Sequence, residues 1–404
     1  MWMLSRLLSG LVRTGTLSVT GPDGTMRRYG SGAPHVAISL TGAATPARIA
    51  RNPALAAGEA FMAGQLRIDA GDAWELVHLF ARNAQQLGQG RALRLLNGSL
   101  RLVSRLDERN PIRRARANVE AHYDLPDALY AAFLDPERHY SCAYFERPEA
   151  SLEEAQAAKV RLIAAKLCLQ PGQRVLDIGC GWGGLARHLA RAHGVEVVGI
   201  TLSPSQARWA QDRAQAEGLG DRVRIALTDW REVDGRFDRI VSVGMFEHVG
   251  RPSYARFFTQ LARLLAPDGV ALLHSIGRPG GPGATDTFTR RYIFPGGYAP
   301  AVSEVVPHIE RSGLWLCDLE VWRLHYARTL RLWWERSMAA RDRLEPLLGG
   351  PRWRMWQWYL AGAAAAFQHG GLAVHQYQLA HARDAVPLTR RYLAEAMDAR
   401  ALGV

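Results

Sequence analysis

The stretch Val175–Gly184 constrains the fold of this chain more than any other part of it. The apolar run Val175–Ile178 predicts a buried strand, and Gly179, Gly181 and Gly183 follow it at alternate positions. Apolar residues at helical spacing come next. A strand that enters a helix through glycines lets the backbone approach a ligand closely, and the helix N-terminus behind it offers unpaired N–H groups. The stretch therefore predicts a nucleotide-type pocket in an α/β fold.

The position of Asp177 narrows the choice of ligand. This acid stands two residues before the first glycine, and the Gly-x-Gly-x-Gly spacing differs from the G-x-G-x-x-G of dinucleotide enzymes. Both features resemble motif I of class I methyltransferases, which use S-adenosylmethionine. The resemblance implies that Asp177, Gly179, Gly181 and Gly183 bind this cofactor.

Polar residues after the next strand candidate extend the pocket. Val195–Ile200 has the β-branched density of a buried parallel strand, and it is followed by Thr201, Ser203 and Gln206. Related pockets carry an acid here for the ribose hydroxyls. Because hydroxyl and amide groups can replace a carboxylate, we interpret these three side chains as cofactor ligands.

A third strand candidate, Val223–Ala226, precedes Asp229 and Trp230. An acid and an aromatic ring at this place can hydrogen-bond and stack an adenine. The alternative interpretation is a loop aspartate beside a packed tryptophan. The pocket already indicated upstream favours the functional interpretation.

Two further strand candidates bring ionisable groups to the same edge of the sheet. Phe237–Val243 leads into Glu247 and His248, and Gly269–Gly277 carries His274 near its end. A histidine on a buried strand is usually a satisfied core residue. Here two such groups come from two strand ends, where ligands of open α/β sheets bind, which favours a functional site.

The order of the motifs resembles the cyclopropane fatty acid synthases, class I methyltransferases that add a methylene group across the double bond of a phospholipid acyl chain. The resemblance covers most of the chain and implies a Rossmann-like doubly wound α/β sheet with a smaller α+β N-terminal domain and helical lipid-binding insertions. The motifs that carry it are Asn118–Leu125, His139–Phe145, Val175–Gly184, Gly199–Ser203, Ser242–Gly250, Leu273–Gly277, Arg291–Gly297 and Tyr326–Leu330.

The chemistry of that family explains the polar set near the strand ends. An alkene that attacks a sulfonium methyl group leaves a carbocation, so the site must exclude water and a base must take a proton from the added methyl group. In the family a bound bicarbonate is thought to be this base. The resemblance implies that it is held by Cys142, Glu247, His274, Ile276 and Tyr326, and that Tyr140 and Ser141 contact S-adenosylmethionine.

The cysteines suggest no other chemistry. A nucleophilic role for the Cys142 thiol is the alternative, but methyl transfer to an unactivated alkene needs no enzyme nucleophile. The four cysteines show neither C-x-x-C spacing nor paired histidines, so we expect no metal site.

The resemblance also predicts the domain organisation. We expect a lipid- and substrate-recognition domain over residues 1–85, a basic linker over 86–117, and a catalytic domain with an acyl-chain groove over 118–404. A segment like Gly58–Leu66 is typical of the synthases that act on whole phospholipids, whereas the mycolic acid relatives largely lack the N-terminal domain. The tryptophans of the C-terminal third are more often core residues, yet some are expected to line the groove.

Charge indicates an acidic partner. The net charge is +12, and all basic residues except Lys159 and Lys166 are arginines. No nucleic-acid motif accompanies the basic segment Arg101–Arg116, which favours an anionic membrane surface over nucleic acid. A solvated helix face is the alternative interpretation of this segment. The opening segment Met1–Arg13 predicts an amphipathic helix that either contacts this membrane or packs on its own domain. No apolar run is long enough to span a bilayer.

These features predict a cytoplasmic enzyme peripherally associated with the inner membrane, acting on unsaturated phospholipid acyl chains. A monomer and a homodimer both stay open. A methyl- or methylene-branched product is an alternative to the ring, because the fate of the cation depends on which proton leaves or whether hydride is added. A non-catalytic lipid-binding paralogue is a more distant alternative.

Overall fold

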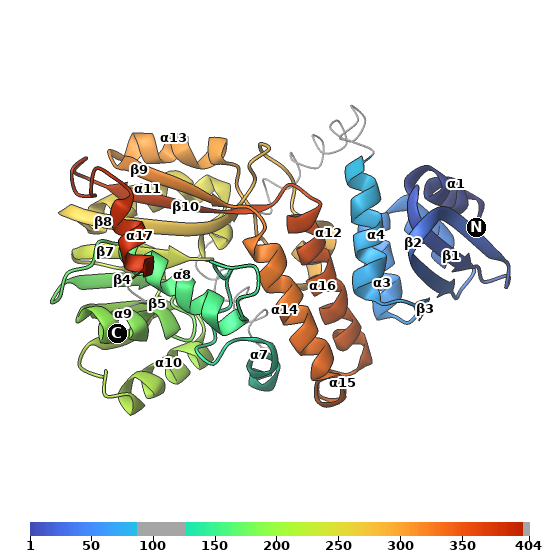
Figure 1. The fold of residues 1–404 in the computed structure, drawn as a ribbon, viewed down its shortest axis with the longest axis horizontal. Helices are drawn as coiled ribbons and strands as arrows, with labels where there is room; N and C mark the ends of the chain where they lie inside the picture. The colour runs from blue at the N-terminus through green and yellow to red at the C-terminus, as the bar shows by residue number, and fades with distance from the viewer. Residues whose placement is uncertain (87–125, 399–404) are drawn as a thin grey trace.

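The computed structural model describes residues 1–86 and 126–398 of the chain. Most of the predicted basic linker lies outside these ranges. So do the whole segment Arg101–Arg116 and the motif Asn118–Leu125. Figure 1 shows a small N-terminal unit, a helical layer and a large sheet with helices on both faces, arranged in a row along the long axis.

The N-terminal unit is a three-stranded antiparallel sheet with four helices. The strand order is β1-β2-β3, and β2 pairs with both neighbours. The elements are α1 (Trp2–Leu11), β1 (Thr14–Thr20), β2 (Met26–Leu40), α2 (Thr45–Arg51), α3 (Pro53–Met62), β3 (Leu66–Ala70) and α4 (Ala73–Gln86).

Helix α1 packs on its own unit through one side only. Leu4 and Leu8 are buried, whereas Trp2, Met3 and Leu7 are exposed. Helix α1 therefore presents apolar side chains both to the core and to the surface. Among the described residues, no helix is both long and apolar enough to cross a membrane.

The large unit is built on a seven-stranded sheet of order β6-β5-β4-β7-β8-β10-β9. Strands β6, β5, β4, β7 and β8 are parallel, and β10 is antiparallel to both β8 and β9. This order, with β4 at the centre of the five parallel strands, is the doubly wound sheet that the sequence predicts. The strands are β4 (Arg174–Ile178), β5 (Glu196–Thr201), β6 (Val223–Leu227), β7 (Phe237–Val243), β8 (Leu265–Gly277), β9 (Trp315–Trp322) and β10 (Ala373–Ala380).

Local sequence explains where the helices begin. Ser151 and Glu154 form a capping box at the start of α8, and the Ser203 side chain caps α10 directly before Pro204. The helices of this unit are α7 (Asp127–Phe133), α8 (Leu152–Lys166), α9 (Gly184–His193), α10 (Pro204–Ala216), α11 (Tyr254–Leu264), α12 (Thr287–Tyr292), α13 (Val302–Ser312), α14 (His325–Ala339), α15 (Arg341–Leu348), α16 (Gly350–Gln368) and α17 (Arg391–Asp398), with short 3₁₀ turns at Trp230–Glu232, Phe246–His248 and Arg251–Ser253.

Helices α14 and α16 lie between the large sheet and the N-terminal unit, and α16 packs against α3 and α4 (Figure 1). The approach is close, because a Cβ at Gly58 of α3 would stand 2.6 Å from the Phe288 ring and 2.8 Å from Trp358 Nε1. The Arg354 guanidinium also donates two hydrogen bonds to the carbonyl of Met62. These contacts fasten the two units to each other.

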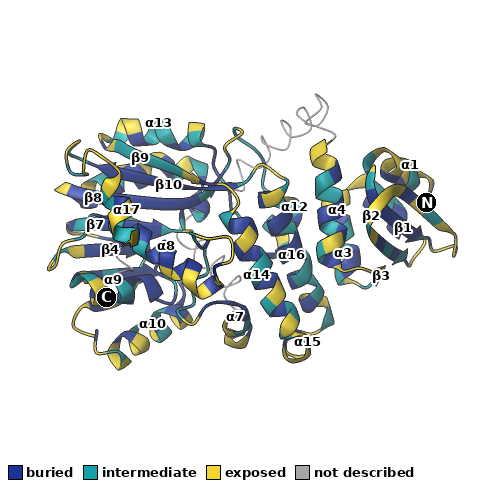
Figure 2. Cartoon of the chain, in the orientation of Figure 1, coloured by how far each residue is buried: buried dark blue, intermediate teal, exposed yellow. Residues whose placement is uncertain are grey.

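Figure 2 shows that the inner strands of the large sheet and the inner sides of α14 and α16 are buried, whereas the edge strands β6 and β9 are largely half-buried or exposed. The largest fully buried side chains include Trp322, Trp333, Trp353 and Trp356. These four tryptophans are core residues, while Trp315 is half exposed on an edge strand. The aromatic density of the C-terminal third thus serves mainly to pack the helical layer.

Candidate functional site

The glycine-rich turn after β4 has the conformation that its sequence predicts. Gly179, Gly181 and Gly183 have φ angles of +83°, +55° and +74°, which residues other than glycine rarely adopt. The Gly179 N–H donates to the carbonyl of Ile200 on β5 at 2.9 Å, which ties the turn to the neighbouring strand. A Cβ at Gly179 would meet Met245 at 2.8 Å, whereas a Cβ at Gly181 would meet nothing within 4 Å.

A pocket lies over this turn, at the carboxyl ends of the parallel strands. Nine of the eleven residues predicted to bind the cofactor line it: Tyr140, Ser141, Asp177, Gly179, Gly181, Thr201, Gln206, Asp229 and Trp230. Gly183 and Ser203 do not line it. Gly183 instead begins α9, and Ser203 accepts a hydrogen bond from the Gln206 N–H at the start of α10.

Asp177 stands at the base of the pocket in an environment that disfavours its charge. Its side chain is buried, and Oδ2 has no hydrogen-bond partner. Burial raises the pKa of the Asp177 carboxyl to about 7, and the Lys159 ammonium opposes that shift. A buried carboxylate oxygen without a partner is suited to accept a hydrogen bond from a ligand.

The side chains after β5 and β6 are organised by their own contacts. The Thr201 hydroxyl donates to Gln206 Oε1 at 3.0 Å, which orients the amide at the pocket wall. Asp229 forms a two-pronged ion pair with Arg231, with distances of 2.6 and 2.7 Å. Trp230 is buried against Phe257. Asp229 and Trp230 thus line the pocket while they also hold the loop together.

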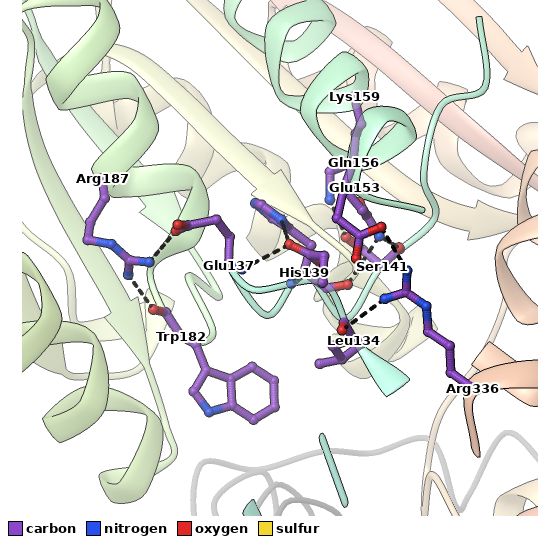
Figure 3. Close-up of polar contacts among 11 residues, drawn as sticks. Leu134, Glu137, His139, Ser141, Glu153, Gln156, Lys159, Trp182, Arg187 and Arg336 are labelled. Carbon is purple, nitrogen blue, oxygen red and sulfur yellow. Dashed lines mark hydrogen bonds and ion pairs between the residues drawn. The ribbon is translucent and has the colours of Figure 1, made fainter. Parts of the chain in front are cut away.

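Sequence reasoning missed part of the pocket wall, namely Arg138 and His139 together with Lys159 and Ile163 of α8. Figure 3 shows the contacts that hold the segment 134–141, to which the first two belong. Gln156 donates to the carbonyls of His139 and Ser141, and Lys159 Nζ donates to Ser141 Oγ at 3.0 Å. On the other side, Arg187 of α9 pairs with Glu137 and donates to the Trp182 carbonyl. The segment is therefore clamped between two helices of the sheet unit.

His139 and Lys159 add ionisable groups to this wall, and burial lowers the pKa of both side chains. The His139 Nδ1 lies 2.8 Å from Asp135 Oδ2, and its buried Nε2 has no partner. Burial lowers the pKa of Lys159 to about 8, and the carboxylates of Asp135 and Asp177 favour its charged form. A signal for Lys159 does exist in the sequence, because it is one of only two lysines in an arginine-rich chain.

Glu247 and His274, here called the second polar group, lie at the ends of the neighbouring strands β7 and β8. Glu247 Oε1 accepts a hydrogen bond from the Ile276 N–H at 2.6 Å, and the buried Oε2 has no partner. Burial raises the pKa of Glu247 to about 7. Burial and the nearby cations Lys159 and Lys166 hold the pKa of His274 well below its usual range, so the imidazole is neutral at pH 7.

Cys142 and Tyr326 lie in the hydrophobic cluster on which the Ile276 side chain packs. Ile276 thus contacts this cluster with its side chain and Glu247 with its backbone. Burial raises the pKa of the Cys142 thiol well above its usual range, which disfavours the nucleophilic thiolate. The Tyr326 ring contacts Trp333 and Phe367, so its surroundings are apolar and aromatic.

The N-terminal unit reaches this second group through α12. Glu59 of α3 accepts a hydrogen bond from the Tyr292 hydroxyl at 2.9 Å and pairs with Arg291 at 3.1 Å. A few residues later, the Tyr298 N–H donates to the Glu247 carbonyl at 2.9 Å. One short segment therefore connects the N-terminal unit with the strand-end carboxylate.

Comparison with known proteins places this arrangement in a family. A sequence model described as mycolic acid cyclopropane synthetase matches residues 111–377, well over half of the chain. The chain belongs to this family. A second model, described as a domain of unknown function (DUF7884), matches residues 3–90, before the match to the cyclopropane synthetase family.

Individual relatives agree with the family. The cyclopropane-fatty-acyl-phospholipid synthase of Escherichia coli K12 is 39% identical over 322 residues, which are 80% of this chain and 81% of the relative. Cyclopropane mycolic acid synthase 3 of Mycobacterium tuberculosis H37Rv is 40% identical over 275 residues, 65% of this chain and 96% of the relative. A mycolic acid cyclopropane synthase solved with SAH and CTAB has a TM-score of 0.63 at 38% identity, covering 68% of this chain and 99% of that one.

These likenesses and the seven-stranded sheet confirm the predicted class I methyltransferase fold and the predicted family. The phospholipid synthase also matches more of this chain than the mycolic acid synthase does.

Proposed function

We propose that this chain is a cyclopropane synthase that acts on unsaturated acyl chains of membrane phospholipids with S-adenosylmethionine as the donor. The observation that carries the proposal is the pocket at the strand ends, built in a chain 39% identical to a cyclopropane-fatty-acyl-phospholipid synthase. A relative was solved with SAH, which is what S-adenosylmethionine becomes after it gives up its methyl group.

The residues of the pocket fit this cofactor. Bound S-adenosylmethionine supplies an electrophilic methyl group on a sulfonium. Gly179 and Gly181 let the backbone approach the cofactor, and the unpartnered oxygen of Asp177 accepts a hydrogen bond from it. Thr201 and Gln206 serve the ribose, and Asp229 and Trp230 serve the adenine.

The second polar group fits a small anion such as bicarbonate. Glu247 has a pKa near 7 and an unpartnered buried oxygen, so its protonated form can donate a hydrogen bond there. The neutral His274 and the Tyr326 hydroxyl add donors, and the backbones of Cys142 and Ile276 complete the set. Bound bicarbonate supplies a base for the proton lost on ring closure. The aromatic cluster around Tyr326 keeps water away and places π-electrons near the cationic carbon.

The N-terminal region supports a whole phospholipid as the substrate. We propose that residues 1–85 recognise the lipid, that 86–117 link the two domains, and that 118–404 carry catalysis and the acyl groove. The charge of +12 and the exposed Trp2, Met3 and Leu7 support peripheral association with an anionic membrane. We place the enzyme at the cytoplasmic face of the inner membrane.

The test is turnover in vitro. Purified protein is incubated with labelled S-adenosylmethionine and vesicles of unsaturated anionic phospholipid, and label in the lipid fraction is measured. We expect label in acyl chains that gain one methylene group. Vesicles of saturated phospholipid are the matched control, and equal labelling of both would contradict the proposal. Sedimentation of the same protein establishes whether it is a monomer or a homodimer.

A further inference from the structure

A row of polar side chains runs across three neighbouring strands to His274, and all of them except the partly exposed Glu320 are buried. His274 on β8, Gln376 on β10 and Glu320 on β9 stand directly opposite one another in the strand register. Lys166, at the end of α8, contacts two of them: its Nζ donates to Glu320 Oε2 and, at 2.8 Å, to Gln376 Oε1. Gln376 Nε2 lies 3.0 Å from His274 Nδ1. Figure 1 shows α8 alongside this part of the sheet.

The chemistry of Lys166 determines the direction of every hydrogen bond in this row. An ammonium group has only donors, so the Gln376 oxygen must face Lys166 and the Gln376 NH₂ must face the imidazole. The NH₂ group can only donate, so His274 Nδ1 must accept. The remaining proton of the neutral ring therefore lies on Nε2.

We propose that Lys166 and Gln376 are positioning residues that hold His274 as its Nε2–H tautomer, so that the ring presents a hydrogen-bond donor to the anion bound beside Glu247. The catalytic half of this inference, namely that the Nε2–H group serves the bound anion, rests on the proposed function. The opposite tautomer would present a lone pair on Nε2, which repels an anion. Lys166 thus determines, through Gln376, which ring nitrogen of His274 carries the proton.

Composition agrees with a dedicated role for this lysine. The chain has only two lysines, both on α8, seven residues and therefore two helical turns apart. Both are buried, and each contacts a residue of the site or its support: Lys159 donates to Ser141, and Lys166 to Gln376.

The decisive variant is Gln376→Glu. Its carboxylate still accepts from Lys166, so the row stays satisfied, but it has no hydrogen to give to Nδ1, which must then carry a proton itself. Gln378→Met is the matched control. Gln378 lies two residues along the same strand and donates to the Lys166 carbonyl at 2.6 Å, so the control also loses a buried amide but leaves the row intact.

The readout is the protonation state of the two ring nitrogens, measured by long-range ¹H–¹⁵N spectra of protein labelled at histidine, with a His274→Asn sample to assign the signals. We expect an unprotonated Nδ1 in the wild type and in Gln378→Met, and a protonated Nδ1 in Gln376→Glu. A protonated Nδ1 in the wild type, or no change in Gln376→Glu, would overturn the inference.

Turnover is measured on the same samples. We expect Gln376→Glu to lose about tenfold or more in kcat, as is typical when the partner that orients a functional histidine is changed, with the KM for S-adenosylmethionine unchanged. A protonated Nδ1 with wild-type turnover would overturn the catalytic half of the inference. Failure of the proposed function is distinguishable, because the wild type would then form no cyclopropane whatever the tautomer.

Discussion

Gly181 offers a direct test of the cofactor pocket, because a substitution there changes the space available to the ligand and disturbs few contacts within the protein. A Cβ at this position would meet no protein atom within 4 Å, and the residue lines the pocket. Gly181→Ala therefore costs stability only through the left-handed backbone, roughly 1–2 kcal/mol. The added methyl group projects into space that the account assigns to S-adenosylmethionine.

The expected loss of affinity follows from that geometry. Forcing one extra carbon into a filled space typically costs about 1–3 kcal/mol, which corresponds to about 5- to 150-fold weaker binding. Isothermal titration calorimetry with S-adenosylmethionine measures this loss directly. Thermal unfolding of the same sample establishes that the variant is folded.

Gly218→Ala is the matched control. Gly218 has a φ of +69° and likewise has open space where a Cβ would stand, but it lies after α10, away from the pocket. The two variants should lose similar stability, and only Gly181→Ala should lose affinity. Wild-type affinity in a folded Gly181→Ala protein, or equal losses of affinity in both, would refute the assignment of the turn to the cofactor.

Three further predictions follow from the buried charges and the surface. Asp177 has a pKa near 7 when folded and 3.8 as its ordinary value, so the stability of the protein without S-adenosylmethionine should fall as pH rises between these values. Asp177→Asn should then melt at a higher temperature than the wild type at pH 8 but not at pH 4, and an equal difference at both would contradict the buried charge. Glu247→Gln should lower kcat by about 10² to 10⁴ with unchanged affinity for S-adenosylmethionine, whereas near wild-type turnover would show that the proton leaves by another route. Binding to anionic vesicles should weaken as the salt concentration rises, since exposed charges are screened over about 8 Å at physiological ionic strength. The Trp2→Ala substitution should weaken this binding further. Equal binding to neutral vesicles would argue against a charged interface.

The strand-end pocket could be predicted from the sequence because each parallel strand carries its own apolar signal. Val175–Ile178, Val195–Ile200 and Val223–Ala226 all became strands, and parallel strands bring their carboxyl ends to one edge. The residues that follow them therefore had to meet, whatever the details of packing. Gly183 and Ser203 were exceptions because each is used to begin a helix.

The supporting residues could not be predicted in this way because they act across long sequence separations. Lys166 reaches Gln376, which lies 210 residues away, and Gln376 reaches His274 across 102 residues. No local periodic pattern in the sequence indicates that two such distant residues form a hydrogen bond. Leu7 is another case, since it has the helical spacing of a core residue relative to Leu4 and Leu8 but is exposed.

The central claim is most directly tested by mass spectrometry of phospholipids from cells with and without this chain, before and after mild catalytic hydrogenation. We predict acyl chains that gain one CH₂ and then take up no hydrogen, as a ring requires. A gain of one CH₂ with uptake of hydrogen would indicate a methylene-branched chain, and a gain of CH₄ a methyl-branched one. Acyl chains identical in the two cell types would contradict the account as a whole.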